Sequence, residues 1–342
     1  MEQVHIVGID LAKNVFQLHG ASSGGAALFR KKLARRRLFP FIASLPRCVI
    51  VMEACAGAHQ WAREFDTAGH KVRLIAPIYV KPFVKRHKND AADAEAIVEA
   101  ALRPTMRFVA IKSAEKQASS MTFKVRDLLV RQRTQLINAL RGHLTEYGIV
   151  APIGLQNLPR LKMALDGDDN DLPEQVRYLC EMMLEQIADL TKRISLLERD
   201  MRCRAKQDDV ASRLMTIPGI GPICATALEA LAPAASTFRK GRDFSAWVGL
   251  VPSQNSSGGK DRLGRISKMG QRDLRRLLVI GASSVVRWAV QRGAPEGSWL
   301  KQMLQRKPRQ LVIIALANRI ARVAWALIAN GGIYRTGQSA VA

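Results

Sequence analysis

Four acidic residues in the first hundred positions have the placement expected of a metal-binding site. Asp10 ends an apolar run at residues 4–10, and Glu53 ends another at residues 48–53. Asp90 and Asp93 lie three residues apart in a helical pattern, so their side chains share one face of a helix. Carboxylates at two strand ends and on one helix can converge at a sheet edge, where hard oxygen ligands favour Mg²⁺, or Mn²⁺ in its place. The sequence therefore predicts that all four acids are catalytic metal ligands.

Two divalent ions match this amount of negative charge. Such a pair, ~3.5–4 Å apart, activates a nucleophile and stabilises the leaving oxygen in phosphoryl transfer. Taken singly, the acids also have structural interpretations, since Asp90 could cap a helix, Asp93 could complement its dipole and Asp10 could cap a turn. Their combination in one basic chain favours the metal site.

The residues around these acids predict one α/β domain at residues 1–112. Apolar and β-branched runs indicate strands at residues 4–10, 15–19, 25–33, 48–53, 72–76 and 106–111, and helical spacing indicates helices at residues 58–68 and 91–102. The run at residues 48–53 is typical of a strand that is covered on both faces. We therefore expect a partly parallel central sheet with helices around it.

The middle of the chain, residues 113–207, predicts a helical coiled-coil hairpin. Apolar residues recur in steps of four and three at positions 176, 180, 183, 187, 190, 194, 197 and 201. A loop at residues 148–171, with the acidic stretch DGDDND, separates this helix from an earlier one. The seam indicates a pairing surface within the chain or between subunits, and a solvent-exposed helical pair is the alternative.

The last region, residues 208–342, is basic and mainly helical. Its Pro-Gly-Ile-Gly turn resembles a helix-hairpin-helix DNA contact, in which Gly219 and Gly221 present backbone N–H groups to a phosphate. A purely structural turn between helices is the alternative. We also expect a group of basic residues, spread along a loop and a helix, to bind nucleic acid. Its members are Lys260, Arg262, Arg265, Lys268, Arg272, Arg275 and Arg276.

The overall charge points to a polyanionic partner. Fifty-three Lys and Arg against 29 Asp and Glu give a net charge of +24, and a shorter basic run contains Lys81, Lys85, Arg86 and Lys88. Because aromatic residues are few, we expect the chain to follow duplexes instead of stacking on single strands. The N-terminus has no targeting pattern, and Arg319 and Arg322 interrupt the apolar segment at residues 311–329. We expect a cytoplasmic protein with no membrane partner and with reduced cysteines.

The sequence around the acids resembles a known family. GIDLAK contains Asp10, MEACAGAH contains Glu53, and NDAADAEAI contains Asp90 and Asp93. Together these stretches resemble the DEDD motif of the Piv-like transposases of insertion-sequence family one-ten. The resemblance continues through the helical middle into IPGIGPICA and FSAWVGLVPSQNSSGGKDRLGRISKMGQRDLRR, so it covers almost the whole chain. It implies a RuvC-like N-terminal domain with an RNase H fold.

The resemblance also implies a catalytic serine in the C-terminal region. Ser257, directly before a glycine, is the better match, and Ser256 is the fallback. The implied reaction is Mg²⁺-dependent cleavage and rejoining of double-stranded donor and target DNA through a serine–phosphate intermediate. A structured guide RNA (often called bridge or seeker RNA) would direct it. The implied assembly is a homo-oligomer, a dimer or, in the synaptic complex, a tetramer.

The position of the histidines limits how such a serine can be activated. All six histidines precede residue 144, so the C-terminal region holds no histidine as a local base. The resemblance suggests a composite site instead, with the acids of one subunit facing the serine of another. Two other classes stay open: a RuvC-like nuclease that hydrolyses junctions with water, and a non-enzymatic architectural protein whose acids are caps. Without the resemblance, the Asn-Ser-Ser-Gly-Gly run indicates a flexible loop.

Overall fold

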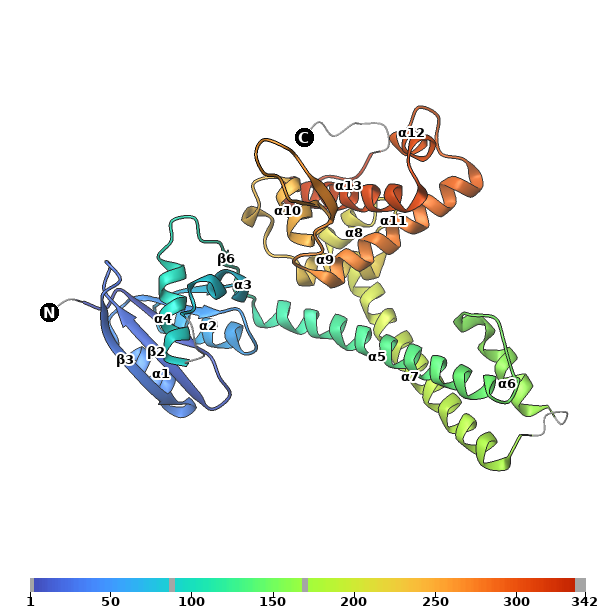
Figure 1. Ribbon diagram of the computed structural model, residues 1–342, viewed down its shortest axis with the longest axis horizontal. Coiled ribbons are helices and arrows are strands. Elements are labelled where there is room, and N and C mark those ends of the chain that lie inside the picture. Colours follow the sequence, from blue (N-terminus) through green and yellow to red (C-terminus); the bar gives the residue numbers. More distant parts are fainter. Residues whose placement is uncertain (1–2, 86–89, 168–171, 336–342) are drawn as a thin grey trace. The chain divides into compact units, whose positions relative to one another are not determined.

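A computed structural model describes residues 3–85, 90–167 and 172–335, apart from the side chains of residues 90 and 91. The chain forms two compact units, Met1–Gln117 (unit 1) and Ala118–Ala342 (unit 2), drawn in Figure 1. Unit 1 contains a sheet covered by helices, and unit 2 is built almost wholly of helices. Most of the predicted middle region therefore lies in the same unit as the C-terminal helices, and a separate middle domain stays a prediction.

Unit 1 is built on a six-stranded sheet in the order β3-β2-β1-β4-β5-β6. β1 pairs with β4, and β4 with β5, in parallel, whereas the other neighbours are antiparallel. The strands are β1 (Ile6–Asp10), β2 (Val15–Ala21), β3 (Ala27–Ala34), β4 (Val49–Glu53), β5 (Lys71–Ile75) and β6 (Phe108–Val109). The predicted α/β domain with a partly parallel sheet is thus confirmed.

The two faces of this sheet pack against separate hydrophobic cores, because successive side chains along a strand point to opposite faces. On one face, Ile9 belongs to a buried cluster with Phe65 of α2. On the other face, Val51 belongs to a buried cluster with Ile97 of α4. The helices of unit 1 are α1 (Arg35–Ala43), α2 (Ala58–Thr67), α3 (Pro77–Val80), the 3-10 turn η1 (Lys81–Phe83) and α4 (Asp90–Ala101). Helix α4 packs on β1, β2 and β4 across this face, which places its first turn near the strand ends.

The sequence patterns missed helix α1. Three consecutive arginines begin this helix and Pro40 lies inside it, so neither its charge nor its composition favours a helix. It forms because Leu38 and Ile42, four residues apart, are both completely buried against the sheet. Strand β6 is shorter than predicted, with only Phe108 and Val109 paired to β5.

Unit 2 begins with an antiparallel pair of long helices, α5 (Ala114–Thr145, from residue 118 on) and α7 (Glu174–Gln207), seen in Figure 1. The Arg126 guanidinium donates to the Glu198 carboxylate at 2.5 and 3.0 Å, and Arg133 donates to the Thr191 hydroxyl at 3.3 Å. The predicted loop at residues 148–171 contains the turn η2 (Leu155–Asn157) and helix α6 (Leu158–Asp166), which the sequence patterns missed.

The predicted seam of α7 is only partly mirrored on α5. Along α7 the buried side chains include Cys180, Ile187, Ile194 and Met201, each seven residues after the last. Along α5, in contrast, Leu128 is 46% exposed although it fits the same helical pattern. The two helices are therefore joined by polar bridges as well as by apolar packing, and a coiled coil stays a prediction.

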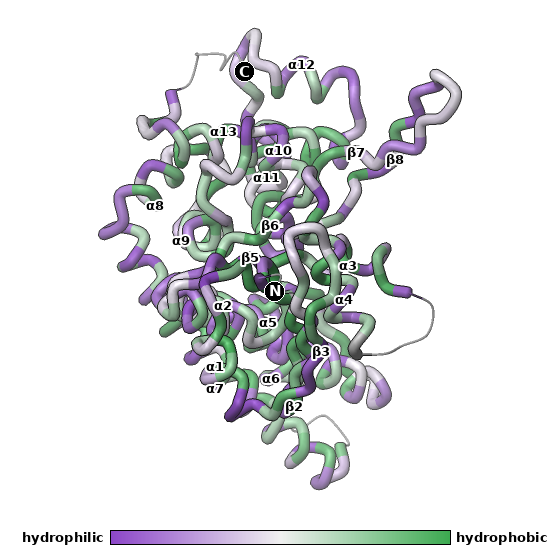
Figure 2. The backbone as a smooth tube through the Cα atoms, turned by 90° about the vertical axis from the view of Figure 1, so that its left-hand side faces the viewer, coloured by the Kyte–Doolittle hydropathy of each residue, from purple (hydrophilic) through white to green (hydrophobic). Residues whose placement is uncertain are grey.

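The rest of unit 2 encloses the largest core of the chain. Phe244, Leu278 and Ala317 come from three helices and are completely buried in it. The elements are α8 (Asp209–Leu214), α9 (Pro222–Leu231), η3 (Ala235–Thr237), α10 (Gly241–Val248), β7 (Pro252–Gln254), β8 (Leu263–Ile266), α11 (Arg272–Arg292), α12 (Trp299–Arg306) and α13 (Arg309–Asn330). Figure 2 shows the β7–β8 hairpin projecting from these helices, with hydrophilic residues along β8. The Asn-Ser-Ser-Gly-Gly run, which by itself indicates a flexible loop, lies between the two strands of this hairpin.

Candidate functional site

The register of two parallel strands brings the first two acids together. β1 and β4 pair with Ile9 opposite Met52, so Asp10 and Glu53, the next residues, end neighbouring strands. Side-chain alternation then places both acids on the face that carries α4, because Val51, two residues before Glu53, is buried on that face.

Helix α4 brings the third acid to the same place because a glycine lets it approach. A Cβ atom on Gly8 would lie 2.5 Å from the Ala94 carbonyl oxygen and 2.7 Å from Val98 Cγ2, so only glycine allows this contact. The helix therefore lies directly against β1 two residues before Asp10. Asp93, next to Ala94 in the chain, is held at the end of that strand.

Asp10, Glu53 and Asp93 line one cavity of about 420 Å³ in unit 1. Its other lining residues are Pro77, Ile78, Lys81 and Val84, from the segment after β5. Asp90 starts helix α4, but its side chain lies outside the described residues. The structure thus brings three of the four predicted acids to one cavity, as expected for carboxylates from two strand ends and one helix.

The electrostatics of this cavity follow from its burial and its charges. Burial is the main reason that the pKa of Glu53 lies above its usual range, and the negative charges of Asp10 and Asp93 raise this pKa further. Because burial and the neighbouring negative charges disfavour the ionised form of Glu53, this cavity favours a bound cation. A divalent ion there would favour the ionised carboxylates.

The donor set fits hard divalent cations. All three described acids offer carboxylate oxygens, the ligands that Mg²⁺ and Mn²⁺ prefer. In the described ranges, no three His, Cys, Asp or Glu side chains converge closely enough to hold a single ion.

The predicted serine lies in unit 2, at the tip of the β7–β8 hairpin. Ser257 and Lys260 form an isolated antiparallel bridge, and the Lys260 N–H donates to the Ser257 carbonyl at 3.1 Å. Gly258 and Gly259 between them have φ values of +56° and +76°, the left-handed region that this tight hairpin turn requires. The turn fixes the backbone of Ser257 while its side chain is exposed.

Hydrogen bonds separate the two candidate serines. The Ser256 hydroxyl donates to Asp261 Oδ1 at 3.1 Å and accepts from Gln254 Nε2 at 3.0 Å and from the Arg262 N–H at 3.1 Å. A hydroxyl has one donor and two acceptor sites, so Ser256 is fully used inside the hairpin. Among the described residues, no hydrogen bond holds the Ser257 hydroxyl. Of the two hydroxyl groups, that of Ser257 is therefore the one that the hairpin's own hydrogen bonds leave available.

Comparison with known sequences finds family models that match ranges in both units. A transposase model of the DEDD type matches residues 7–149, and the model "Transposase IS116/IS110/IS902 family" matches residues 211–295. The first range includes Asp10, Glu53 and Asp93, and the second includes Ser257. The chain belongs to this family of insertion-sequence transposases.

Relatives of the transposase match over nearly its whole length. A family 20 transposase of Pseudomonas aeruginosa is 45% identical over 97% of this chain and 98% of its own length. The transposase for insertion sequence element IS1328 of Yersinia enterocolitica is 40% identical over 98% of this chain and 99% of its own. The transposase for IS1111A of Coxiella burnetii is 37% identical over 98% of this chain and 93% of its own length. The protein is therefore an enzyme of DNA recombination.

The predicted nucleic-acid contacts of the transposase divide into exposed and internally held groups. Arg275 donates to the Val248 and Met269 carbonyls at 2.7 and 2.8 Å, which fastens the loop before α11. Arg276 forms an ion pair with Asp127 of α5, which is 8% exposed. Both guanidinium groups thus have structural partners within unit 2. The exposed members are Lys260, Arg262, Arg265, Lys268 and Arg272.

The two glycines of the predicted DNA-contact turn also differ. Gly219 has a φ of +93°, and a Cβ on Gly281 of α11 would lie 1.9 Å from its carbonyl oxygen. Gly219 is therefore required for packing between the turn and α11, as in the structural alternative. Gly221 is exposed, with no atom within 4 Å of the Cβ position, and it precedes α9. A phosphate contact at either glycine stays a prediction.

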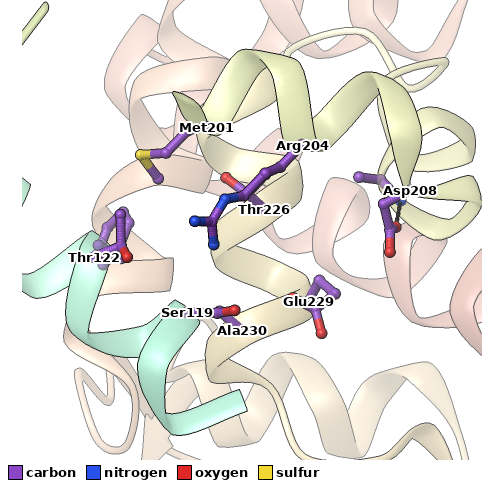
Figure 3. A pocket seen from close by; sticks show the side chains of 10 residues that line it. Ser119, Thr122, Met201, Arg204, Asp208, Thr226, Glu229 and Ala230 are labelled. Atoms are coloured by element: carbon purple, nitrogen blue, oxygen red, sulfur yellow. Dashed lines mark hydrogen bonds between the residues drawn. The ribbon is translucent and has the colours of Figure 1, made fainter. Parts of the chain in front are cut away.

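A second cavity, of about 230 Å³, lies between α5, α7 and α9 of unit 2 (Figure 3). Arg204, Asp208 and Glu229 all line it, so charges of both signs are present. Arg204 pairs with Asp200 at 3.0 Å, and Asp208 Oδ1 accepts the Ala211 N–H at 2.6 Å as the cap of α8. Because these charged groups have partners within the fold, we interpret this cavity as a gap in the packing between helices and not as a binding site.

Sequence reasoning missed the place of one cation in the acid cavity. Lys81 was assigned only to a general basic run with Lys85, Arg86 and Lys88, of which Arg86 and Lys88 lie outside the described residues. The structure places Lys81 beside Asp10, Glu53 and Asp93. Its position in the segment that follows β5, one short helix after the strand end, was the signal that could have found it, because strand ends on this side of the sheet carry the acids.

Proposed function

We propose that this transposase cleaves and rejoins DNA at a two-metal site and passes through a serine–phosphate intermediate. The observation that carries the proposal is the meeting of Asp10, Glu53 and Asp93 in one cavity of a family member. Its sheet order, with the antiparallel meander β1–β2–β3 continued by parallel β4 and β5, supports an RNase H-like, RuvC-like fold for unit 1.

In this proposal Mg²⁺, with Mn²⁺ as a substitute, is held by Asp10, Glu53 and Asp93, and by Asp90 if its side chain joins them. The ions would supply Lewis-acid stabilisation of charge on the phosphate oxygens. The protein contributes rigidity: two strand ends and a helix packed on Gly8 keep the carboxylates apart and oriented.

The serine chemistry follows from the hairpin. Ser257 Oγ forms a bond to phosphorus while the bond from phosphorus to one sugar oxygen breaks; the hydroxyl proton leaves the serine, and the sugar oxygen takes up a proton. Attack by the sugar hydroxyl of a second DNA end reverses these changes and frees Ser257. Unit 2 holds His143 as its only histidine, on α5 and outside the hairpin, so the carboxylate site must supply the activation. We infer that the acids and the serine come from different subunits of a homo-oligomer, a dimer or a synaptic tetramer.

Nucleic-acid partners are inferred from charge and family. The net charge of +24 and the exposed cations of the hairpin support binding of double-stranded donor and target DNA. Guidance by a structured RNA is part of the proposal because the same charges bind either nucleic acid. We place the protein in the cytoplasm: helix α13 is long and apolar enough to cross a membrane, but Val312, Ala317 and Ala321 are buried in the unit 2 core.

A second function has one observation in its favour. The acid cavity is formed entirely by unit 1, whereas Ser257 lies on unit 2. A RuvC-like nuclease that uses water as its nucleophile would need only the former. An architectural protein would need neither.

A trapping assay separates these functions. The transposase is incubated with Mg²⁺, RNA transcribed from the element's flanks and end-labelled donor and target DNA, and label retained by the denatured protein is measured. We expect retention by the wild type and by the control Glu99→Gln on α4, because the Glu99 carboxylate pairs with Arg103. Asp93→Asn, Asp10→Asn and Ser257→Ala should abolish it.

The other outcomes decide between the alternatives. DNA that is cut without retained label, equally by the wild type and Ser257→Ala, would establish the water-using nuclease. DNA that is bound but uncut, with or without metal, would indicate the architectural protein. Retention by Ser257→Ala but not by Ser256→Ala would reverse the assignment of the nucleophile.

A further inference from the structure

Lys81 is held at the acid cavity by neighbours on both sides. It follows α3 directly and begins η1, and the neighbouring Val80 is only 1% exposed. Phe83, at the end of η1, packs against the core beneath α4, with the Arg103 guanidinium 5.8 Å from its ring centre. Pro82 restricts the backbone between these anchors. The backbone of Lys81 is therefore fixed while its side chain stays exposed.

The ammonium group of Lys81 differs from that of Lys85, four residues later. Lys85 Nζ lies 2.6 Å from Glu95 Oε1, and the same carboxylate accepts from Arg30 at 2.9 Å. No ion pair joins Lys81 to a carboxylate that the structure describes, although it lines the cavity with three of them. Lys85 is thus held by an ion pair within the fold, whereas the ammonium group of Lys81 is available at the cavity.

Charge balance indicates what Lys81 binds. Four carboxylates would cancel the charge of two divalent ions, so a phosphodiester that enters the site adds one uncompensated negative charge. An ammonium ion on the cavity wall neutralises that charge. Lysine is a common phosphate ligand that acts as a point charge, and its flexible stem suits a phosphate that moves during exchange.

We propose that Lys81 binds a non-bridging oxygen of the DNA phosphate that occupies the acid cavity and thereby positions it for attack. This inference rests on the proposed function, since it requires that the cavity receives a phosphodiester. It adds to that function a catalytic contact outside the four acids and the serine.

The test uses Lys81→Met, Lys81→Arg and the matched control Lys85→Met in the full chain. Binding of a fluorescent DNA duplex is followed by anisotropy in Ca²⁺ over a series of KCl concentrations, and cleavage is measured separately in Mg²⁺. For Lys81→Met we expect weaker binding, with a salt slope reduced by about 0.9, and cleavage slower by about 10²-fold. Lys81→Arg should keep the salt slope, and Lys85→Met should cleave as the wild type does.

Each result decides one point. Lys81→Met that binds and cleaves like the wild type overturns the inference while the metal site stands. Equal losses of duplex binding and cleavage in Lys81→Met and Lys85→Met also overturn it, because the effect would then come from the lower positive charge of the protein as a whole. A wild type that cleaves no DNA under any metal condition contradicts the proposed function itself; in that case an unchanged salt slope in Lys81→Met would contradict the phosphate contact as well. Thermal unfolding midpoints confirm that the variants are folded.

Discussion

The two parts of the candidate site are built in opposite ways. In unit 1 the acids end strands whose preceding residues are buried, and Ile9 and Met52 are both completely inaccessible. In unit 2 the serine stands on a two-stranded hairpin whose residues 254–265 are all exposed. The acids are positioned by a core, whereas the serine is positioned by a turn and a few side-chain hydrogen bonds.

This difference has a physical reason. Metal ligands need a geometry that holds to a fraction of an ångström, which packed strands and helices provide. In the proposed reaction the serine reaches the acids of another subunit and carries DNA, which requires a segment that moves; exposed segments with few buried contacts open at low free-energy cost. The contrast leads to four predictions.

The largest effect is expected from mixing two inactive proteins. Asp10→Asn and Ser257→Ala should each reduce covalent DNA retention by at least about 10³-fold, because each removes one part of a site that acts as a unit. If acids and serine act between subunits, a mixture of the two variants should regain retention, since some assemblies pair an intact cavity with an intact hairpin. A mixture as inactive as its components would place both parts of the site in the same subunit.

Thiol labelling should report the two cores separately. Burial raises the pKa of Cys48 in unit 1 to about 11 and that of Cys224 in unit 2 to about 12. At pH 8 either thiol should therefore react at least about 10²-fold more slowly than the exposed Cys203. Labelling of Cys48 should still rise as the pH approaches 11, the raised pKa of its thiol.

Mass spectrometry after pulses of alkylation in increasing urea checks this prediction. The order in which Cys48 and Cys224 become reactive gives the order in which the units open. Fast labelling of either thiol in the native protein would show that its core is not closed.

Two glycine contacts allow the units to be destabilised one at a time. Gly8→Ala would press on Ala94 and Val98 in unit 1, and Gly281→Ala would press on Gly219 in unit 2. Each should lower the free energy of unfolding by about 1–3 kcal/mol. Gly8→Ala should also weaken Mn²⁺ binding, because it displaces the helix that carries Asp93.

Gly142→Ala on α5 is the control. This glycine has no atom within 4 Å of its Cβ position and lies within a helix, so alanine should stabilise it by up to about 1 kcal/mol. Urea unfolding of the three variants measures the effects. Equal loss of Mn²⁺ binding in Gly8→Ala and Gly281→Ala would contradict the separation of the two units.

The smallest effect concerns the exposed and internally held cations of unit 2. Arg265→Gln on the hairpin should reduce the salt slope of duplex binding by about 0.9 and leave stability unchanged. Arg275→Gln should lower stability by about 1–3 kcal/mol, because two carbonyl groups lose their donor, and leave the slope nearly intact. Anisotropy titrations and thermal unfolding compare them. A slope change in Arg275→Gln as large as in Arg265→Gln would show that the arginine leaves its partners to bind DNA.

The sequence by itself determined the α/β unit and the succession of strands along the chain. It also determined that Asp10 and Glu53 end two of these strands, because side-chain alternation and strand ends are local patterns. It also indicated the serine stretch through the family resemblance. The Asn-Ser-Ser-Gly-Gly run by itself indicated a flexible loop. In the structure this run forms the tip of the β7–β8 hairpin, which is held by a turn of two glycines and by the hydrogen bonds of Ser256 to Gln254 and Asp261. Local periodicity does not connect these residues.

Only the tertiary structure decided which charged residues are available. In the sequence, Arg276 looks like Lys260, and Lys85 looks like Lys81. In the structure, however, Arg276 pairs with Asp127, 149 residues away, and Lys85 pairs with Glu95, 10 residues away. Likewise Gly219 is a packing residue because Gly281, far along the chain, lies against it. An ionic partner or a steric neighbour is fixed by where the chain returns in space, and a one-dimensional pattern of residue types does not contain that information.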